Sequence, residues 1–250
     1  MSRLAFSGVT KTYRTRRDES VTALASIDLE LGDGELVCLV GRSGCGKTTL
    51  LRIAAGVEVA SAGAVLLDGA RIEGPSPAIG MVFQEDRLLP WRSVQANVEL
   101  GLEIAHVAAP KRRVLAARAL ELVDLKGFAA AYPNELSGGM RQRAAIARAL
   151  VNEPGVILLD EPFGALDAET RTQMQRELLR LRAAIGSTVL FVTHSVDEAV
   201  VLADRVVVLS PRPGRIHGEF RIEAPHPRDV SATDLAEQRR AILEALGDAG

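Results

Sequence analysis

The chain has 250 residues, of which 47% are hydrophobic and 25% charged, which is typical of a globular protein with one large α/β domain or two small ones. Its formal net charge of -2 argues against the strongly basic surface of a nucleic-acid-binding domain. The two cysteines, Cys38 and Cys45, lie too close together for a secreted disulfide framework, which favours a reducing compartment. No apolar run approaches the roughly 18 residues of a membrane-spanning helix, and the N-terminus has no long apolar stretch, so we expect neither a membrane span nor a signal peptide.

The N-terminal part of the chain has the period-two pattern of antiparallel strands. Apolar and polar residues alternate over 27–31, and a second short apolar segment lies at 65–67. The second segment runs directly into Asp68 and Gly69, a dipeptide that favours a tight hairpin turn. We therefore predict an antiparallel sheet in this part of the chain.

Short apolar runs without alternation occur along the rest of the chain. They lie at 36–40, 79–83, 156–159, 189–192 and 206–209. Because a strand that is covered by helices on both faces is apolar throughout, these runs predict a mainly parallel sheet.

Helical patterns fill the intervals between these runs. The alanine-rich stretch of about 88–152 predicts a helical insertion in the α/β core. Asp167 is a candidate N-cap and Gly186 a candidate stop for a further helix. The tail reads as one amphipathic helix, so we divide the chain into a core domain of 1–232 and a C-terminal helix and tail of 233–250.

A glycine-rich loop at 41–49 is the most informative motif. It follows the run 36–40, precedes a helical pattern and reads Gly41-Arg42-Ser43-Gly44-Cys45-Gly46-Lys47-Thr48-Thr49, a Walker A motif in its strand–loop–helix setting. Glycines let backbone N–H groups surround phosphate oxygens at a helix N-terminus. Lys47 would add its charge toward the β- and γ-phosphates, and Thr48 its hydroxyl toward Mg²⁺. The motif predicts nucleotide binding rather than a chance glycine-rich turn, but by itself does not separate kinases and GTPases from other P-loop enzymes.

A second helix start has the character of an anion site. Ser137 is a good N-cap, and Gly138 and Gly139 leave backbone N–H groups open at the start of a helical run. An ordinary capped helix explains these residues equally well when they are considered alone.

The run 156–159 ends in two adjacent carboxylates, Asp160 and Glu161. Neighbouring residues of an extended backbone point to opposite faces, so the two acids are suited to different tasks. Asp160 suits the Mg²⁺ shell, and Glu161 suits a water molecule aimed at the γ-phosphate. The plain alternative is a charged strand end at the surface.

The chain resembles the ATP-binding cassette (ABC) superfamily over nearly its whole length, about residues 4–216. The resemblance rests on the order of three motifs, at 41–48, 136–143 and 160–161. The Leu-Ser-Gly-Gly-x-x-Gln-Arg signature at 136–143 is specific, since kinases and GTPases lack it. It implies an α/β fold with a P-loop NTPase core of mainly parallel strands, an N-terminal antiparallel β subdomain and an inserted α-helical subdomain.

The resemblance implies roles for further residues. Tyr13 would stack on adenine, Gln84 would contact Mg²⁺ or water and sense a permease, and His194 would contact the γ-phosphate. Asp167 closes the segment 164–167, which resembles the D-loop that crosses the interface of the ABC dimer. A surface tyrosine and a structural histidine are the plain alternatives for Tyr13 and His194.

The expected site has three overlapping groups of residues. Catalytic roles fall to Lys47, Gln84, Glu161 and His194. The Mg²⁺ ligands are Thr48, Gln84 and Asp160. The residues that bind ATP are Tyr13, Gly41, Ser43, Gly44, Cys45, Gly46, Lys47, Thr48, Thr49, Ser137, Gly138, Gly139 and Asp167.

Two positions depart from the family pattern, because Cys45 and Gly164 stand where serine is common. Inward N–H groups and the charge of Lys47 favour a thiolate, so we expect Cys45 to be a reactive thiol that ATP protects. A small residue that the loop merely tolerates is the alternative. Cys38 lies in an apolar run and is expected to be inert.

The resemblance implies a head-to-tail dimer that holds ATP between one chain's Walker A loop and the other chain's signature helix. This motor would lie at the cytoplasmic face of the inner membrane and energise transmembrane permease subunits. An extracytoplasmic solute-binding protein would deliver the solute to the permease. The loop 86–93 resembles the surface that receives the permease, and Trp91 is expected there rather than in the core. Together with 210–216, this loop is most similar to bacterial importers of nitrate, sulfonate and taurine.

Two readings from other classes compete with an importer motor. One is a non-transport ABC ATPase that acts on nucleic acid or ribosomes, but the long coiled coils or paired cassettes of such proteins are not seen in this sequence. The other is a small-metabolite kinase, which has no use for the signature at 136–143. We therefore expect ATP hydrolysis coupled to transport and no nucleic-acid partner.

Overall fold

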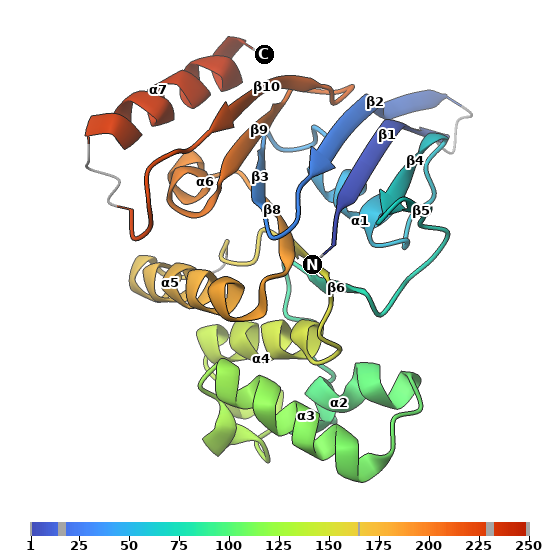
Figure 1. Cartoon of the computed structure of the whole chain (residues 1–250), viewed down its shortest axis with the longest axis vertical. Coiled ribbons are helices and arrows are strands. Elements are labelled where there is room, and N and C mark those ends of the chain that lie inside the picture. Colours follow the sequence, from blue (N-terminus) through green and yellow to red (C-terminus); the bar gives the residue numbers. More distant parts are fainter. Residues whose placement is uncertain (1, 15–18, 165, 229–232, 249–250) are drawn as a thin grey trace. The chain divides into compact units, whose positions relative to one another are not determined.

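The computed structural model describes residues 2–14, 19–164, 166–228 and 233–248. These residues form two compact units (Figure 1). The first unit consists of Met1–Ser76 and Ser187–Gly250, and the second of Pro77–Gly186.

The N-terminal part of the first unit is an antiparallel sheet. Its strands are β1 (Leu4–Arg14), β2 (Ser20–Leu31), β4 (Ala62–Leu67) and β5 (Ala70–Arg71), in the order β2-β1-β4-β5. Asp68 and Gly69 join β4 to β5 with φ of 51° and 83°, the left-handed values that a two-residue hairpin turn requires. The predicted antiparallel strands and turn are confirmed.

The remaining strands of the first unit are mainly parallel. They are β3 (Leu36–Val40), β8 (Thr188–Thr193), β9 (Arg205–Leu209) and β10 (Ile216–Arg221). β3 pairs in parallel with β8 on one side and with β9 on the other, and β10 runs antiparallel to β9. Every residue of β3 and β8 is buried, as predicted for strands covered on both faces.

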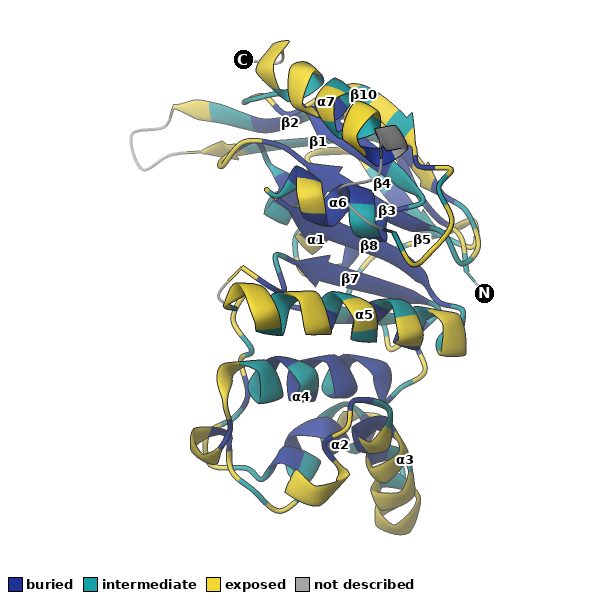
Figure 2. Cartoon of the chain, turned by 90° about the vertical axis from the view of Figure 1, so that its left-hand side faces the viewer, coloured by how far each residue is buried: buried dark blue, intermediate teal, exposed yellow. Residues whose placement is uncertain are grey.

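Helices pack against this parallel sheet. They are α1 (Lys47–Ala54), which contacts β8, α6 (Val196–Leu202), which contacts β3 and β8, and α7 (Thr233–Asp248), which contacts α6, β9 and β10. The predicted C-terminal helix is confirmed by α7, which buries Leu235 and Ile242 and exposes its other side (Figure 2). Arg239 of α7 also forms an exposed ion pair with Asp197 of α6.

The second unit is largely helical. Its elements are β6 (Ile79–Val82), α2 (Val94–Ile104), α3 (Ala109–Leu122), the 3₁₀ turns η1 (Lys126–Phe128) and η2 (Pro133–Glu135), α4 (Gly138–Leu150), β7 (Val156–Asp160) and α5 (Ala168–Ile185). The helices α2, α3 and α4 pack on one another, and β6 pairs in parallel with β7. This unit is wider than the helical segment 88–152, because it also contains β6, β7 and α5.

The caps in the second unit confirm the helix boundaries read from the sequence. The Asp167 carboxylate accepts hydrogen bonds from the amide (3.0 Å) and the hydroxyl (2.7 Å) of Thr170 at the start of α5. Gly186 ends α5 with φ of 70°. The Ser137 hydroxyl accepts a hydrogen bond from the Met140 amide (3.3 Å) and so caps α4.

Candidate nucleotide-binding site

The phosphate loop connects β3 to α1 in the first unit. Gly44 and Gly46 have φ of 80° and 105°, so the chain curls in a way that only glycine permits without strain. At Gly46 the chain also passes close to β2, because an added Cβ would lie 2.6 Å from Cδ2 of Leu24. The loop therefore has a fixed shape, and α1 begins in the sequence directly after Gly46.

Lys47 organises this loop from within. Its side chain is buried, and its ammonium donates hydrogen bonds to the carbonyl oxygens of Gly41 (2.7 Å) and Arg42 (3.2 Å). The loop thus closes around a positive charge. Ammonium and backbone N–H groups at a helix N-terminus form a cradle suited to phosphate oxygens.

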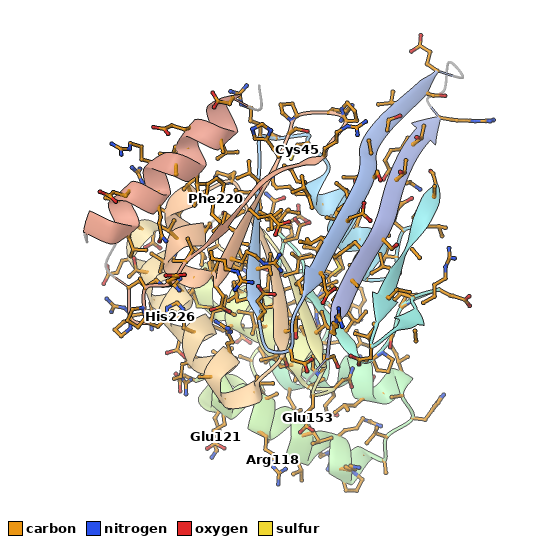
Figure 3. The ribbon with its side chains drawn as sticks, turned by 45° about the horizontal axis from the view of Figure 1, so that its top comes forward. Cys45, Arg118, Glu121, Glu153, Phe220 and His226 are labelled. Atoms are coloured by element: carbon orange, nitrogen blue, oxygen red, sulfur yellow. The ribbon has the colours of Figure 1, made fainter. Side chains whose placement is uncertain are left out.

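Cys45 lies inside the loop rather than on its surface. Its side chain is 1% exposed, its Sγ lies 3.9 Å from Nζ of Lys47, and it sits beside the loop that follows β9 (Figure 3). This burial counts against the expected reactive thiol, because reactivity also requires access to solvent. The side chain turns into the narrow space next to Gly41, where an added Cβ would lie 2.7 Å from Sγ. Cys38 is fully buried in β3, as expected.

The loop after β9 braces the phosphate loop, a contact that the sequence did not reveal. Because β9 is the parallel neighbour of β3, the segments that follow both strands lie at the same edge of the sheet. The Gly214 amide donates to the carbonyl oxygen of Ala23 (2.9 Å), and Arg212 donates to that of Gly44 (3.5 Å). The Pro- and Gly-rich composition of 210–215 is typical of a turn, but composition does not indicate which segment the turn contacts.

His194 reaches the same edge of the sheet. Thr193, the last residue of β8, pairs with Val40, the last residue of β3. His194 and Gly41 are thus the next residues on two neighbouring strands, and the His194 side chain is exposed. The first unit therefore brings the phosphate loop and His194 together, as the parallel-sheet prediction required.

Tyr13 lies in the antiparallel sheet of the first unit, near the end of β1. Its side chain is 38% exposed, and the ammonium of Lys11 lies 4.9 Å from the centroid of its ring. Lys11 also pairs with Glu58 (2.5 Å) and donates to the carbonyl oxygen of Val59 (2.7 Å). Tyr13 is thus a supported, partly exposed aromatic ring, a geometry that suits stacking.

The acidic pair lies at the end of β7 in the second unit. Asp160 is the last residue of the strand and is 5% exposed. Glu161 follows with φ of 44°, a left-handed value that is uncommon outside glycine and concentrates at functional sites. The carbonyl oxygen of Glu161 accepts a hydrogen bond from the Gly164 amide (3.1 Å), which closes a tight turn. Ala165, in the segment that resembles the D-loop, lies outside the described residues.

Gln84 and the acidic pair share one edge of the second unit. Val82, the last residue of β6, pairs in parallel with Leu159, so the segments that follow the two strands leave in the same direction. Gln84 is exposed two residues beyond this pair. This arrangement follows from the parallel pairing of β6 and β7.

The glycine-rich start of α4 is an accessible helix N-terminus. Ser137 and Gly138 are exposed, and Gly139 is half-buried against α5, where an added Cβ would lie 2.8 Å from Cγ2 of Thr170. A residue larger than glycine at 139 would therefore clash with the Thr170 side chain unless that side chain moved. Free backbone N–H groups at such a start attract anions.

Two arginines of α4 hold the loop that follows Gln84, which the sequence also did not reveal. Arg148 donates to the carbonyl oxygens of Asp86 (2.7 Å) and Arg87 (2.6 Å). Arg141 donates to the Asp86 carboxylate (3.1 Å). Burial lowers the pKa of the Arg148 guanidinium below its ordinary value, and the charge of Asp86 opposes part of that shift.

Two of the expected Mg²⁺ ligands, one in each unit, have suitable donor atoms. Thr48 and Asp160 carry hydroxyl and carboxylate oxygens, the hard ligands that Mg²⁺ prefers. The described residues contain no group of three or more histidines, cysteines and acids that could hold a metal ion by themselves.

The part of the chain that the structure describes contains no helix both long and apolar enough to cross a membrane.

Comparisons with known proteins agree on one family. The family model for ABC transporters matches residues 24–164. An aliphatic sulfonates import ATP-binding protein of Xanthomonas axonopodis is 47% identical over 246 residues, covering 97% of this chain and 98% of the relative. An uncharacterized ABC transporter ATP-binding protein of Methanocaldococcus jannaschii is 48% identical over 246 residues, covering 98% of this chain and 92% of the relative.

A solved structure shares the fold. It is a dimeric ATP-binding cassette in a post-hydrolysis state with ADP and Pi bound, and it matches with a TM-score of 0.77 at 33% identity, covering 89% of this chain and 100% of that chain. With its antiparallel sheet, mainly parallel strands, helical insertion and Walker A loop, this chain belongs to the ABC transporter family as an ATP-binding cassette.

Proposed function

We propose that the chain is the ATP-hydrolysing subunit of an importer for aliphatic sulfonates or chemically similar small anions. The observation that carries this proposal is near-full-length similarity to aliphatic sulfonates import proteins, at 41% identity in Bacillus cereus and 47% in Xanthomonas axonopodis. The permease and a solute-binding protein would select the solute, and the cassette would supply the free energy.

Nucleotide binding follows from the phosphate loop. The inward N–H groups of Gly41, Ser43, Gly44, Cys45, Gly46, Lys47, Thr48 and Thr49 would hold the phosphates, and the Lys47 ammonium would turn from its two carbonyl partners toward the β- and γ-phosphates. The partly exposed ring of Tyr13 would stack on the base. The Thr48 hydroxyl, the Asp160 carboxylate and Gln84 would hold Mg²⁺, which neutralises phosphate charge when bound.

Hydrolysis would depend on Glu161. Its carboxylate would orient a water molecule and accept its proton as the water oxygen bonds to the γ-phosphorus and the bond to the β–γ bridging oxygen breaks. The products are ADP and inorganic phosphate. His194 would steady the γ-phosphate, and Lys47 would stabilise the charge that develops on it.

The start of α4 would act on the partner copy's nucleotide. In a head-to-tail dimer, Ser137, Gly138 and Gly139 would present their N–H groups to the γ-phosphate held by the other chain. Asp167 would lie at the same dimer interface. ATP would thus join the two cassettes, and hydrolysis would release them. The permease would bind at the loop 86–93 on the cytoplasmic side of the membrane.

The decisive variant is Glu161→Gln, which keeps the size of the side chain and removes the base. We expect ATP binding to be retained and kcat to fall by about 10²–10⁴-fold, the usual contribution of a positioned base. Size-exclusion chromatography with MgATP should then show a trapped dimer. Glu121→Gln, a change on the exposed face of α3, is the matched control and should hydrolyse ATP normally. Hydrolysis by Glu161→Gln near the wild-type rate would contradict the role of Glu161.

The transport part of the proposal needs a cellular test. A deletion strain should lose uptake of aliphatic sulfonates, and wild-type protein but not Glu161→Gln should restore it. Purification from detergent-solubilised membranes should recover a permease. Recovery of ribosomes or nucleic acid instead, with normal sulfonate uptake in the deletion strain, would overturn the importer.

A further inference from the structure

Glu198 is a buried carboxylate that the proposed reaction does not use. It lies in the first turn of α6, four residues after His194, and is 7% exposed. Burying an acidic side chain is costly unless hydrogen bonds compensate it, so its partners indicate what it does.

Glu198 and its partners form a small ring of hydrogen bonds that joins the residues on both sides of His194. The hydroxyl of Thr193 donates to the Glu198 carboxylate (2.5 Å) and accepts a hydrogen bond from the Ser195 amide (3.0 Å). The ring closes because the Glu198 amide donates to the hydroxyl of Ser195 (3.3 Å). In an ordinary capping box the glutamate would reach the N-cap amide directly, whereas here the Thr193 hydroxyl is inserted between them.

This ring fixes the backbone on both sides of His194. Thr193 is 1% exposed and is held in the sheet by its pairing with Val40, directly before the phosphate loop. Ser195 is held by its cap on α6. His194 is exposed between these two anchors, so its backbone position is fixed on one side by the sheet and on the other by the helix cap.

We propose that Thr193 and Glu198 are positioning residues for His194, an inference that rests on the proposed role of His194 at the γ-phosphate. A buried, charge-assisted hydrogen bond is stronger than a neutral one and holds one geometry. This bond holds the backbone that carries His194 at the edge of the sheet where the phosphate loop begins. The ring acts on the chemical step through His194 and makes no contact with nucleotide.

Thr193→Val tests the proposal because it keeps the shape of the side chain and removes the hydroxyl. We expect kcat for ATP to fall by about 10- to 100-fold, as for a misplaced catalytic group. KM should change by less than about twofold, because the phosphate loop is untouched. Thr193→Ser, which restores the hydroxyl, should recover most of the activity.

A double-mutant cycle with His194→Ala separates positioning from simple stabilisation. If Thr193 acts through His194, Thr193→Val should change kcat little further once His194 is alanine. An equal loss of kcat in both backgrounds would overturn the proposal. Glu198→Gln, which keeps an acceptor oxygen but loses the charge, should give a smaller loss with the same dependence on His194, and it serves if Thr193→Val does not fold.

A spectroscopic measurement makes the test independent of activity. The chain has four histidines, so the imidazole NMR signals of the wild-type subunit can be assigned by single substitutions. Thr193→Val or Glu198→Gln should shift or broaden the His194 signal and leave those of His106, His217 and His226 unchanged. An unmoved His194 signal would overturn the positioning role, whereas normal kcat in His194→Ala would overturn only the proposed role of His194.

Discussion

At the scale of single residues, the charge of the helix cap Asp167 is expected to contribute to the stability of the folded chain. Hydrogen bonds from the amide and the hydroxyl of Thr170 hold the pKa of the Asp167 carboxyl below its ordinary value. A lowered pKa in the folded state means that folding favours the ionised form. The contribution to stability is complete above the pKa of the unfolded chain, about 3.9, and is lost as pH falls through the lower folded pKa.

Asp167→Asn should therefore destabilise the nucleotide-free subunit at neutral pH, and this deficit should shrink below about pH 3.9. Asparagine still caps a helix, so the variant isolates the charge. Thermal unfolding of both proteins between pH 7 and pH 3 measures the difference. Glu237→Gln, which removes an exposed charge from α7, controls for net charge. A deficit that does not depend on pH would show that the cap does not act through its ionised form.

At the scale of elements, α4 joins two motifs that are far apart in sequence. Its start carries the signature, and Arg141 and Arg148 hold the loop that follows Gln84. A single rigid helix thus links the expected permease-binding loop to the residues expected to close on ATP. The link is a bidentate arginine contact with two backbone carbonyls, for which lysine has no equivalent geometry.

Arg148→Met tests this link between elements. It removes both donors and leaves two carbonyl groups without them, which should cost about 1–3 kcal/mol. We expect a lower midpoint of unfolding, and Arg148→Lys should not restore it. Arg118→Met, on the exposed face of α3, removes the same charge as a control and should leave the midpoint unchanged (Figure 3). Equal midpoints for Arg148→Met and Arg118→Met would show that the loop does not depend on Arg148.

At the scale of the whole molecule and its assembly, Trp91 is expected to lie at the permease interface. It is the only tryptophan of the chain and is 72% exposed, so the alternative of a core-anchoring tryptophan is wrong. A large exposed aromatic side chain suits a binding surface. The permease contact itself remains a prediction.

Acrylamide should therefore quench the fluorescence of the isolated subunit efficiently. Addition of the permease in detergent should reduce the quenching constant and shift the emission to the blue, because the indole becomes buried in the interface. Addition of an unrelated membrane protein is the control. Quenching that the permease leaves unchanged would place its contact elsewhere on the subunit.

The sequence predicted much of the architecture because its signals are local. The run 36–40 matches β3 residue for residue, and the caps Asp167 and Gly186 bound α5 as expected. A strand that is buried on both faces has a continuous apolar run, and a capped helix has characteristic residues at its ends, so both can be recognised from a few neighbouring residues. The Walker A motif could be recognised for the same reason, because the strand before it and the helix after it are visible in the neighbouring sequence.

By itself, then, the sequence determined the order of the motifs, the α/β class and the identity of the family. Only the tertiary structure decided that Cys45 turns inward, that Arg212 contacts the phosphate loop, and that Thr193 and Glu198 form a ring around His194. The physical reason is that a side chain's direction and partners depend on segments brought together by packing. Arg212 and Gly44 are separated by 168 residues, and no local pattern of composition or spacing records such a contact.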